Sequence, residues 1–227
     1  MVIRQRAIQA EDKQERQQAI LDAAARLLAR SPERIANVAE VADEAGLAKG
    51  TVYLYFPSKE ELLLAVHERN IDGFFRALID RLGQTSPATI GDILALTHTY
   101  MVEPPLFLPL AARCFGLMGQ SVPLDAAVAF KQRMGERLAK AGAGIERHFP
   151  ELKPGDGVAL LRHSYALIIG LWQMSAESQR HNLGCPMTGQ GETPPAFQYD
   201  YPVELDRALL ALWSGTVGHT VTAEETR

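Results

Sequence analysis

Apolar residues recur at three- and four-residue spacing along most of the chain, and this spacing is the period of an amphipathic helix. Over residues 13–29 the pattern forms one apolar stripe, which consists of Ile20, Leu21, Ala24, Leu27 and Leu28. Ser31-Pro32 ends this helix, because the residue before a proline disfavours the α region. Residues 1–12 are mostly polar and lack the period, so we predict a flexible arm ahead of the first helix.

Two short helices joined by a glycine are predicted next, over 37–45 and 49–55. Asn37 opens the first of them, and Glu40 lies three residues later, at the spacing of a capping box. Gly46 ends it, because glycine adopts the left-handed conformation after a helix at little cost. This pattern is typical of a helix-turn-helix, in which the second helix enters the major groove of DNA.

Longer helices are predicted for the rest of the chain. Ser58 caps one that reaches about Leu82, and Glu61 completes its capping box. Further helical segments are predicted over 86–100, 106–117, 123–148, 156–178 and 201–219. Residues 180–200 contain six glycine or proline residues and no period, which indicates a long loop. The fold class is therefore predicted to be all-α.

The charge distribution refines this picture. The net charge is -4, yet residues 1–60 contain nine Lys or Arg and nine Asp or Glu. The remaining 167 residues contain 14 positive and 18 negative side chains, so the acid excess lies away from the predicted DNA-binding end. Neutrality at that end predicts modest non-specific DNA affinity, because neutralisation of phosphates drives this kind of binding.

Other function classes lack their motifs. The six histidines show no His-x-x-x-His spacing and the cysteines no paired spacing, so we predict no metal site. There is no Gly-x-Ser-x-Gly, and Gly189-x-Gly191 follows no strand, so we predict neither catalysis nor a cofactor. The first 16 residues are polar and no apolar run nears 20 residues, so neither a leader nor a membrane span is predicted. Cys114 and Cys185 form no disulfide framework, which favours a cytoplasmic protein with Cys114 in its core.

The second short helix carries the candidate DNA-binding residues. Val52 and Phe56 are four residues apart and are expected to face inward. The residues left to face outward or to flank are Lys49, Thr51, Tyr53, Leu54 and Tyr55. Gly50 allows the backbone to approach a phosphate, and Lys59 can donate to a phosphate at the start of the next helix.

Several short motifs occur here in order and at fixed spacing: Ala45-Gly46, Lys49-Gly50-Thr51, Tyr53-Leu54-Tyr55-Phe56 and Ser58-Lys59-Glu60-Glu61-Leu62. Residues 13–73 thereby resemble the DNA-binding domain of the TetR family of transcriptional regulators. The resemblance implies an N-terminal three-helix DNA-binding domain over 13–73 and a larger helical effector-binding and dimerisation domain over 74–227. It also implies a homodimer that a small molecule releases from DNA.

Carried over by position, the resemblance assigns DNA contacts to Val38, Lys49, Gly50, Thr51, Tyr53, Leu54, Tyr55 and Lys59. Thr51 and Leu54 would lie nearest the base edges. Tyr53, Tyr55 and Lys59 would mainly hold phosphates, which positions the protein without specifying a sequence. The alternative for the two tyrosines is ordinary packing. Ala48 departs from the family, which often has serine there, so a helix cap is lost.

The C-terminal half carries weaker signals. By resemblance, its last two helices pair with a second copy, and the expected interface residues are Trp172, Leu209 and Trp213. The candidates for an apolar effector pocket with a few polar groups are His98, Phe107, Arg113, Phe115, Met118, Phe130, Met134, His163 and Trp172. Burial in the core of one subunit is the alternative for each of them.

These observations predict a dimeric repressor that binds a palindromic double-stranded operator and responds to a small-molecule effector. Two alternatives remain open. One is a DNA-binding regulator without such an effector, and the other is a helical enzyme or carrier whose N-terminus only resembles a DNA-binding unit. The sequence names neither the operator nor the effector.

Overall fold

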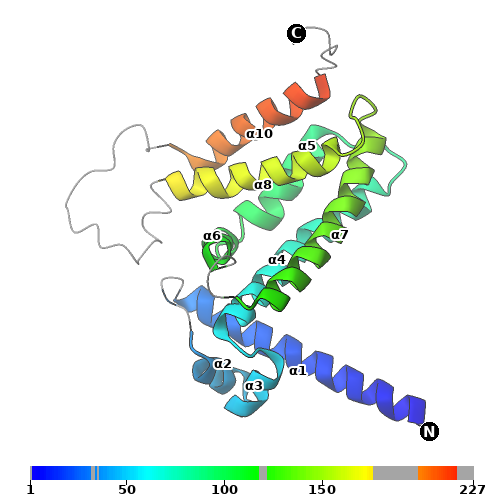
Figure 1. Cartoon of the computed structure of the whole chain (residues 1–227). Helices are drawn as coiled ribbons and strands as arrows, with labels where there is room; N and C mark the ends of the chain where they lie inside the picture. The colour runs from blue at the N-terminus through cyan, green and yellow to red at the C-terminus, as the bar shows by residue number, and fades with distance from the viewer. Residues whose placement is uncertain (1, 32–33, 35, 118–121, 176–198, 219–227) are drawn as a thin grey trace, which may run out of the picture.

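The computed structural model describes residues 2–31, 34, 36–117, 122–175 and 199–218, and every regular element among them is a helix (Figure 1). Side chains are described from residue 12 onward, except at 115–117. The predicted loop over 180–200 lies almost wholly outside these residues, as does Cys185. Within the described part, no helix has both the length and the apolar character that crossing a membrane requires. The predicted all-α class is confirmed.

The N-terminal head consists of α1 (Val2–Arg30), α2 (Val38–Ala45), α3 (Lys49–Tyr55) and the first half of α4 (Lys59–Leu82). Its core contains predicted inward residues, among them Ile20, Leu21, Leu28, Val41, Ala42, Val52 and Phe56, together with Leu62 of α4. The 3.6-residue period had predicted these faces, because one apolar stripe per helix is enough to bury the two short helices α2 and α3 against the long helices α1 and α4.

The N-terminal arm was predicted wrongly. Helix α1 already begins at Val2, and Figure 1 shows its first half extending away from α2 and α3. Residues 2–12 contain neither glycine nor proline and are rich in Ala, Gln, Arg and Glu, which are good helix formers. The helix therefore continues through a polar segment that has no apolar stripe.

The turn signals are confirmed at atomic detail. The Asn37 side chain accepts from the Glu40 amide at 3.1 Å, and Glu40 Oε2 accepts from the Asn37 amide at 2.8 Å. Gly46 has φ 66° and ψ 32°, the left-handed cap. Ser58 Oγ accepts from the Glu61 amide at 3.1 Å, which is the first hydrogen bond of the predicted capping box. In place of the second, from the Ser58 amide to the Glu61 carboxylate, the Ser58 hydroxyl donates to Glu61 Oε1.

The remaining helices form the helical domain beyond the head. They are α5 (Ile90–Thr97), the π-helical turn η1 (His98–Val102), α6 (Phe107–Leu117), α7 (Leu124–His148), α8 (Asp156–Met174) and α10 (Tyr201–Gly218). Figure 1 shows α7 beside α4, with α8 and α10 packed together at the far end from α3. A second core lies between them, so α4 contributes to both cores and the predicted boundary at residues 73 and 74 falls inside this one helix.

Helix α5 begins at Ile90, later than the predicted start at residue 86. Thr89 is the N-cap, and its hydroxyl accepts from the Asp92 amide at 3.2 Å while Asp92 Oδ2 accepts from the Thr89 amide at 2.7 Å. The guanidinium of Arg81 donates to the carbonyls of Ser86 and Pro87, which holds that segment against the end of α4. The contact with Arg81 thus competes with a helix start at Ser86.

Candidate nucleic-acid interface and internal cavity

Helix α3 is anchored by one face and exposed on the other. Val52 is fully buried and Phe56, which follows the helix, is 5% exposed, and both pack in the core of the head. The opposite face presents Tyr53, at 43% exposed, and Leu54, at 84% exposed. A leucine this exposed has no packing role within the chain, so it is available to an apolar group of a partner such as a thymine methyl.

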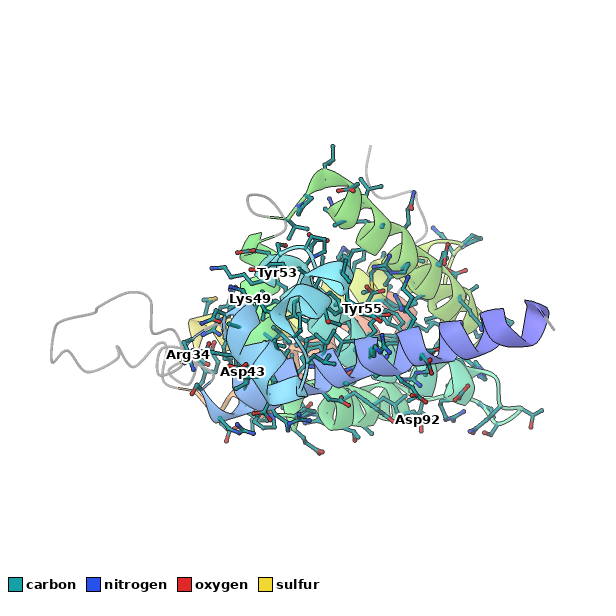
Figure 2. The ribbon with its side chains drawn as sticks, turned by 90° about the horizontal axis from the view of Figure 1, so that it is seen from below. Arg34, Asp43, Lys49, Tyr53, Tyr55 and Asp92 are labelled. Carbon is teal, nitrogen blue, oxygen red and sulfur yellow. The ribbon has the colours of Figure 1, made fainter. Side chains whose placement is uncertain are left out.

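The start of α3 has an open backbone. Ala48 is the N-cap with an extended backbone (φ −68°, ψ 141°) but no side-chain cap, and its carbonyl accepts from the Thr51 amide at 2.8 Å. A Cβ at Gly50 would meet no atom within 4 Å, so the space beside it is open on the outside. Lys49 Nζ lies 5.9 Å from the centroid of the Tyr53 ring. Figure 2 shows Lys49 and Tyr53 next to each other on the α3 end of the molecule.

The eight predicted DNA-contact residues do not share one environment. Five are exposed, namely Lys49, Gly50, Tyr53, Leu54 and Lys59, while Thr51 and Tyr55 are half-buried. The Val38 side chain is buried at 5% exposed in the core of the head, so that only its backbone at the start of α2 is near the surface. Seven of the eight residues are therefore exposed or half-buried on α3 or next to it; at Gly50 the exposed group is the backbone.

Many cations of the head are already paired. Glu44 on α2 accepts from Arg26 at 2.7 Å and from Arg30 at 2.9 Å, and Arg34 pairs with Glu40 at 2.8 Å. Hydrogen bonds from Arg30 and then Arg26 hold the pKa of Glu44 below its ordinary value. By contrast, Lys49 forms no salt bridge with any described residue. Its charge is therefore free for a phosphate, within a head that is neutral overall.

The helical domain encloses a cavity of about 540 Å³, to which α4, α5, η1, α6, α7, α8 and α10 all contribute. Its wall is mostly apolar and includes Phe74, Phe75, Met101, Leu138, Leu161 and Ile168. This volume falls in the range of small-molecule sites, which are mainly apolar with a few polar groups. The cavity is thus the candidate effector site of the chain.

The polar groups that form hydrogen bonds in the cavity wall include His67 of α4 and Ser164 and Tyr165 of α8. His67 Nε2 lies 3.0 Å from the Tyr165 hydroxyl, and Ser164 Oγ accepts from Trp213 Nε1 at 2.9 Å. Burial lowers the pKa of His67 to about 4, so the imidazole is neutral at pH 7. Its Nδ1 atom is buried and has no hydrogen-bond partner among the described residues.

The predicted pocket residues divide into two groups. Phe130 and Met134 of α7 line the cavity. Phe107 is buried behind it, with its ring centroid 5.6 Å from that of His67. The other described candidates, His98, Arg113, His163 and Trp172, are not part of the wall. His98 Nε2 instead lies 2.6 Å from Asp206 Oδ1 on α10. The Phe115 side chain and Met118 lie outside the described residues.

His67 and Tyr165 were not predicted as site residues. His67 lies on the apolar stripe of α4, four residues after Leu63 and four before Ile71, where sequence alone suggests an ordinary core position. A histidine in such a stripe was the available signal. Its partner is 98 residues away, and no local pattern connects the two.

The predicted interface residues need correction. Trp172 is 3% exposed, Leu209 1% and Trp213 fully buried, all within a single copy of the chain. Trp213 packs edge-on against Phe149, with centroids 6.1 Å apart, and lines the cavity. Large apolar side chains that are exposed on the same two helices are Met174, Val203 and Leu210.

A second hollow, of about 510 Å³, lies between α1, α4 and α7. Four of its charged groups are paired with one another: Arg133 donates to Glu68 at 2.7 Å, and Arg137 donates to Asp72 at 2.9 Å. Burial raises the pKa of Glu68, but the hydrogen bonds from Arg133 and Arg137 outweigh it and hold the pKa below its ordinary value. This hollow is therefore a charged junction between helices.

Among the described residues, no group of three or more His, Cys, Asp or Glu is placed to hold a metal ion.

Comparison with known families gives two adjoining matches. Residues 20–66 match the family described as bacterial regulatory proteins, tetR family. Residues 68–219 match a family described as tetracyclin repressor-like, C-terminal domain. The two matches meet within α4, the helix that joins the two cores.

Curated relatives match over less than a third of the chain. The fatty acid metabolism regulator protein of Bacillus subtilis (strain 168) is 30% identical over 69 residues, 30% of this chain and 36% of that protein. An uncharacterised helix-turn-helix regulator of the same organism, YfiR, is 37% identical over 68 residues, 30% of this chain and 33% of its own length. The matched region thus spans about a third of these relatives.

Solved structures resemble the chain over most of its length. The fatty acid degradation regulator FadR from Bacillus halodurans has a TM-score of 0.57 at 16% identity, over 87% of this chain and 98% of that one. A transcriptional regulator from Pseudomonas aeruginosa PAO1, described as putative, has a TM-score of 0.55 at 16% identity, over 91% and 92%. At this identity the likeness concerns the fold. With the family matches covering both parts, the chain belongs to the TetR family of bacterial transcriptional regulators.

Proposed function

We propose that this protein is a repressor that binds a palindromic operator as a homodimer and leaves it when a small molecule fills the cavity of the helical domain. The observation that carries the proposal is helix α3, which has a buried anchor on one face and Lys49, Tyr53 and Leu54 exposed on the other. A regulator of this kind acts by binding rather than by catalysis, and it works in the cytoplasm, where bacterial DNA is.

The proposed dimer uses the outer faces of α8 and α10. Leu210 and Val203 are 45% and 57% exposed on α10, and packing among the described residues does not bury them. A Cβ at Gly170 of α8 or at Gly215 of α10 would meet no atom within 4 Å, so both helices present open, small positions on their outer sides. A second copy packed through these faces would bury the leucine and valine, and a two-fold axis would pair two α3 helices for a palindrome.

The proposed switch acts through α4, which touches both cores. His67 and Ile71 of α4 line the cavity, and two residues after His67 the guanidinium of Arg69 reaches α1. Arg69 donates to Asp22 Oδ1 at 2.5 Å and to the Leu21 carbonyl at 3.3 Å. A ligand that favours a shifted α4 would therefore move the head and change the spacing of the two α3 helices. Successive major grooves would then no longer fit both copies.

The fatty acid regulators among the relatives do not identify the effector. Their curated matches cover about a third of their length, so what these regulators bind is not carried over to this chain. The regulator resemblance supports DNA binding, while the effector has to be argued from the cavity wall itself.

The proposal is tested by selecting bound duplexes from a random DNA pool and measuring the affinity of the selected site by gel shift at fixed salt. We expect a palindromic site, a two-to-one protein to DNA stoichiometry, and a mass of two chains for the free protein in sedimentation. Tyr53→Ala should weaken binding by roughly tenfold, because it removes a hydrogen bond to a charged phosphate. Its circular dichroism and melting temperature should not change.

Two exposed leucines provide a matched control. Leu54 on α3 is 84% exposed and Leu124 at the start of α7 is 80% exposed, so truncation to alanine has little effect on folding in either case. Leu54→Ala should weaken the selected site, whereas Leu124→Ala should not. Equal affinities for all variants and the parent would show that α3 is not the DNA-binding element, and no selected site at all would rule out the repressor.

A further inference from the structure

The His67–Tyr165 pair is an unusual feature of an otherwise apolar cavity. His67 is 3% exposed and its ring forms part of the wall, as does Tyr165. One imidazole nitrogen, Nε2, is within 3.0 Å of the Tyr165 hydroxyl, and the other, Nδ1, has no partner among the described residues. A buried polar atom without a partner is costly, and native proteins keep such atoms mostly where a ligand or another group completes them.

The positions of the hydrogen atoms determine which hydrogen-bond donor and acceptor the pair offers to a ligand. The neutral imidazole has one N–H and the phenol has one O–H, and one of these two hydrogens lies between His67 Nε2 and the Tyr165 oxygen. If the phenol donates, Nδ1–H remains as a donor and the phenol oxygen as an acceptor. If Nε2–H donates, the phenol O–H remains as a donor and Nδ1 as an acceptor. In either tautomer the pair therefore has one donor and one acceptor left.

The pair is also uncharged. Burial keeps the pKa of His67 at about 4, with the nearby Glu68 carboxylate opposing this effect only in part. Burial raises the pKa of Tyr165 and brings that of the Cys114 thiol to about 12, so both keep their protons at pH 7. The charged residues that belong to the wall are Lys131 and Arg162, and both are exposed. An anion at the buried pair would lose its hydration without a facing cation.

The size of the cavity sets a limit on the ligand. At the roughly 30 Å³ that one water molecule occupies in the liquid, 540 Å³ holds about 18 non-hydrogen atoms. Most of these atoms would contact apolar side chains, because the wall away from His67, Tyr165 and Ser164 is dominated by aliphatic and aromatic residues.

We propose that the effector is an uncharged, mainly apolar molecule of up to about 18 non-hydrogen atoms, with one polar group that both donates and accepts a hydrogen bond, as an alcohol or an amide does. This group completes the His67–Tyr165 pair inside the cavity. The inference rests on the proposed function only in taking the cavity as the effector site. The competing ligand class is a long-chain carboxylate whose anion stays outside at Lys131 and Arg162.

Binding of matched probes separates the two classes. The probes are dodecan-1-ol and dodecanoate, which have the same apolar chain and differ in the head group, and binding is followed by calorimetry and by fluorescence of Trp213, which lines the cavity. We expect the alcohol to bind at least about tenfold more tightly than the carboxylate at pH 7.5. His67→Phe and Tyr165→Phe should each weaken the alcohol about tenfold and change carboxylate binding little.

Two controls keep the outcome clear. Leu124→Ala, at an exposed position of α7 that is not part of the cavity wall, should leave alcohol binding within about twofold. The double variant His67→Phe/Tyr165→Phe should fold about as well as the parent, since it replaces both members of the pair and leaves neither without its partner. Its melting temperature without ligand should therefore stay about the same while alcohol affinity falls, a combination that a purely structural role for the pair would not give.

The proposal is overturned if the carboxylate binds as tightly as the alcohol, or if binding depends on Lys131→Gln and Arg162→Gln but not on His67→Phe. It is also overturned if neither probe binds. Gel shifts on the selected operator, run with the same preparations, keep the two proposals apart. Retained operator binding in any of these cases leaves the repressor standing and removes only the ligand class, whereas absent operator binding refutes the repressor itself.

Discussion

The crossing of α7 and α8 depends on two glycines, and a single methyl group there should destabilise the protein measurably. A Cβ at Gly157 would lie 2.9 Å from the carbonyl carbon of Gly142 and closer still to its oxygen. A Cβ at Gly142 would lie 2.6 Å from Val158 Cγ2 and 2.8 Å from the Val158 nitrogen. These neighbours are mostly backbone atoms, so no side-chain rotation can relieve the contact, and the two helices must move apart.

The cost of Gly157→Ala follows from this geometry. Overpacking of a tight site costs about 1–3 kcal/mol, and here the separation also disturbs the carboxylate of Glu146, which accepts from the amides of Gly155 and Gly157 at 2.8 and 3.1 Å. Alanine recovers up to about 1 kcal/mol of helix propensity. The net loss should be about 2 kcal/mol, which lowers the melting temperature of a chain this long by roughly 4–8 °C.

The matched control is Gly135→Ala in the middle of α7. A Cβ there meets no atom within 4 Å, so only the propensity gain applies, and stability should rise by about 1 kcal/mol. Both variants are compared with the parent by thermal and urea unfolding. If Gly157→Ala is as stable as Gly135→Ala, then α7 and α8 do not cross closely at these glycines and the reasoning is refuted.

Two further predictions concern the head and the cavity. Ala48→Ser should raise the free energy of unfolding by about 1 kcal/mol in urea melts, because the N-cap of α3 already has the extended backbone that a serine cap needs; an unchanged midpoint would count against that cap geometry. For His67, the folded pKa of about 4 lies below the ordinary 6.5, so the unfolded chain binds the extra proton and stability is lost as the pH falls from 6.5 to 4. That loss should approach about 3 kcal/mol, and His67→Phe should remove it from the difference between urea melts at pH 7 and pH 4; an equal pH slope in both proteins would contradict the buried neutral imidazole.

The head was largely predictable, because its signals are local. The capping box of Asn37 and Glu40 and the left-handed Gly46 each involve residues within a few positions of one another, and backbone hydrogen bonding fixes them regardless of the rest of the chain. The inward faces of Val52 and Phe56 follow from the helical period. The error at residues 2–12 arose because a helix needs no apolar stripe where propensity alone suffices.

The helical domain was less predictable. Its sequence shows which residues are apolar, but it does not show which side chains each of them contacts. Trp172 and Trp213 were assigned to an interface, yet packing within one copy already buries both. Only two of the seven described pocket candidates line the cavity, since the wall is assembled from seven separate elements. The helical period of the sequence does not encode how these elements are oriented relative to one another.

The sequence by itself thus determined the helices, their caps and the α3 surface with Lys49, Tyr53 and Leu54, because these rest on interactions between near neighbours along the chain. The tertiary structure alone decided that His67 meets Tyr165, 98 residues away, inside an apolar cavity. It also decided that Gly142 and Gly157 lie where two helices cross closely. Both outcomes depend on how whole helices pack, and packing is set by the fit of many distant side chains at once.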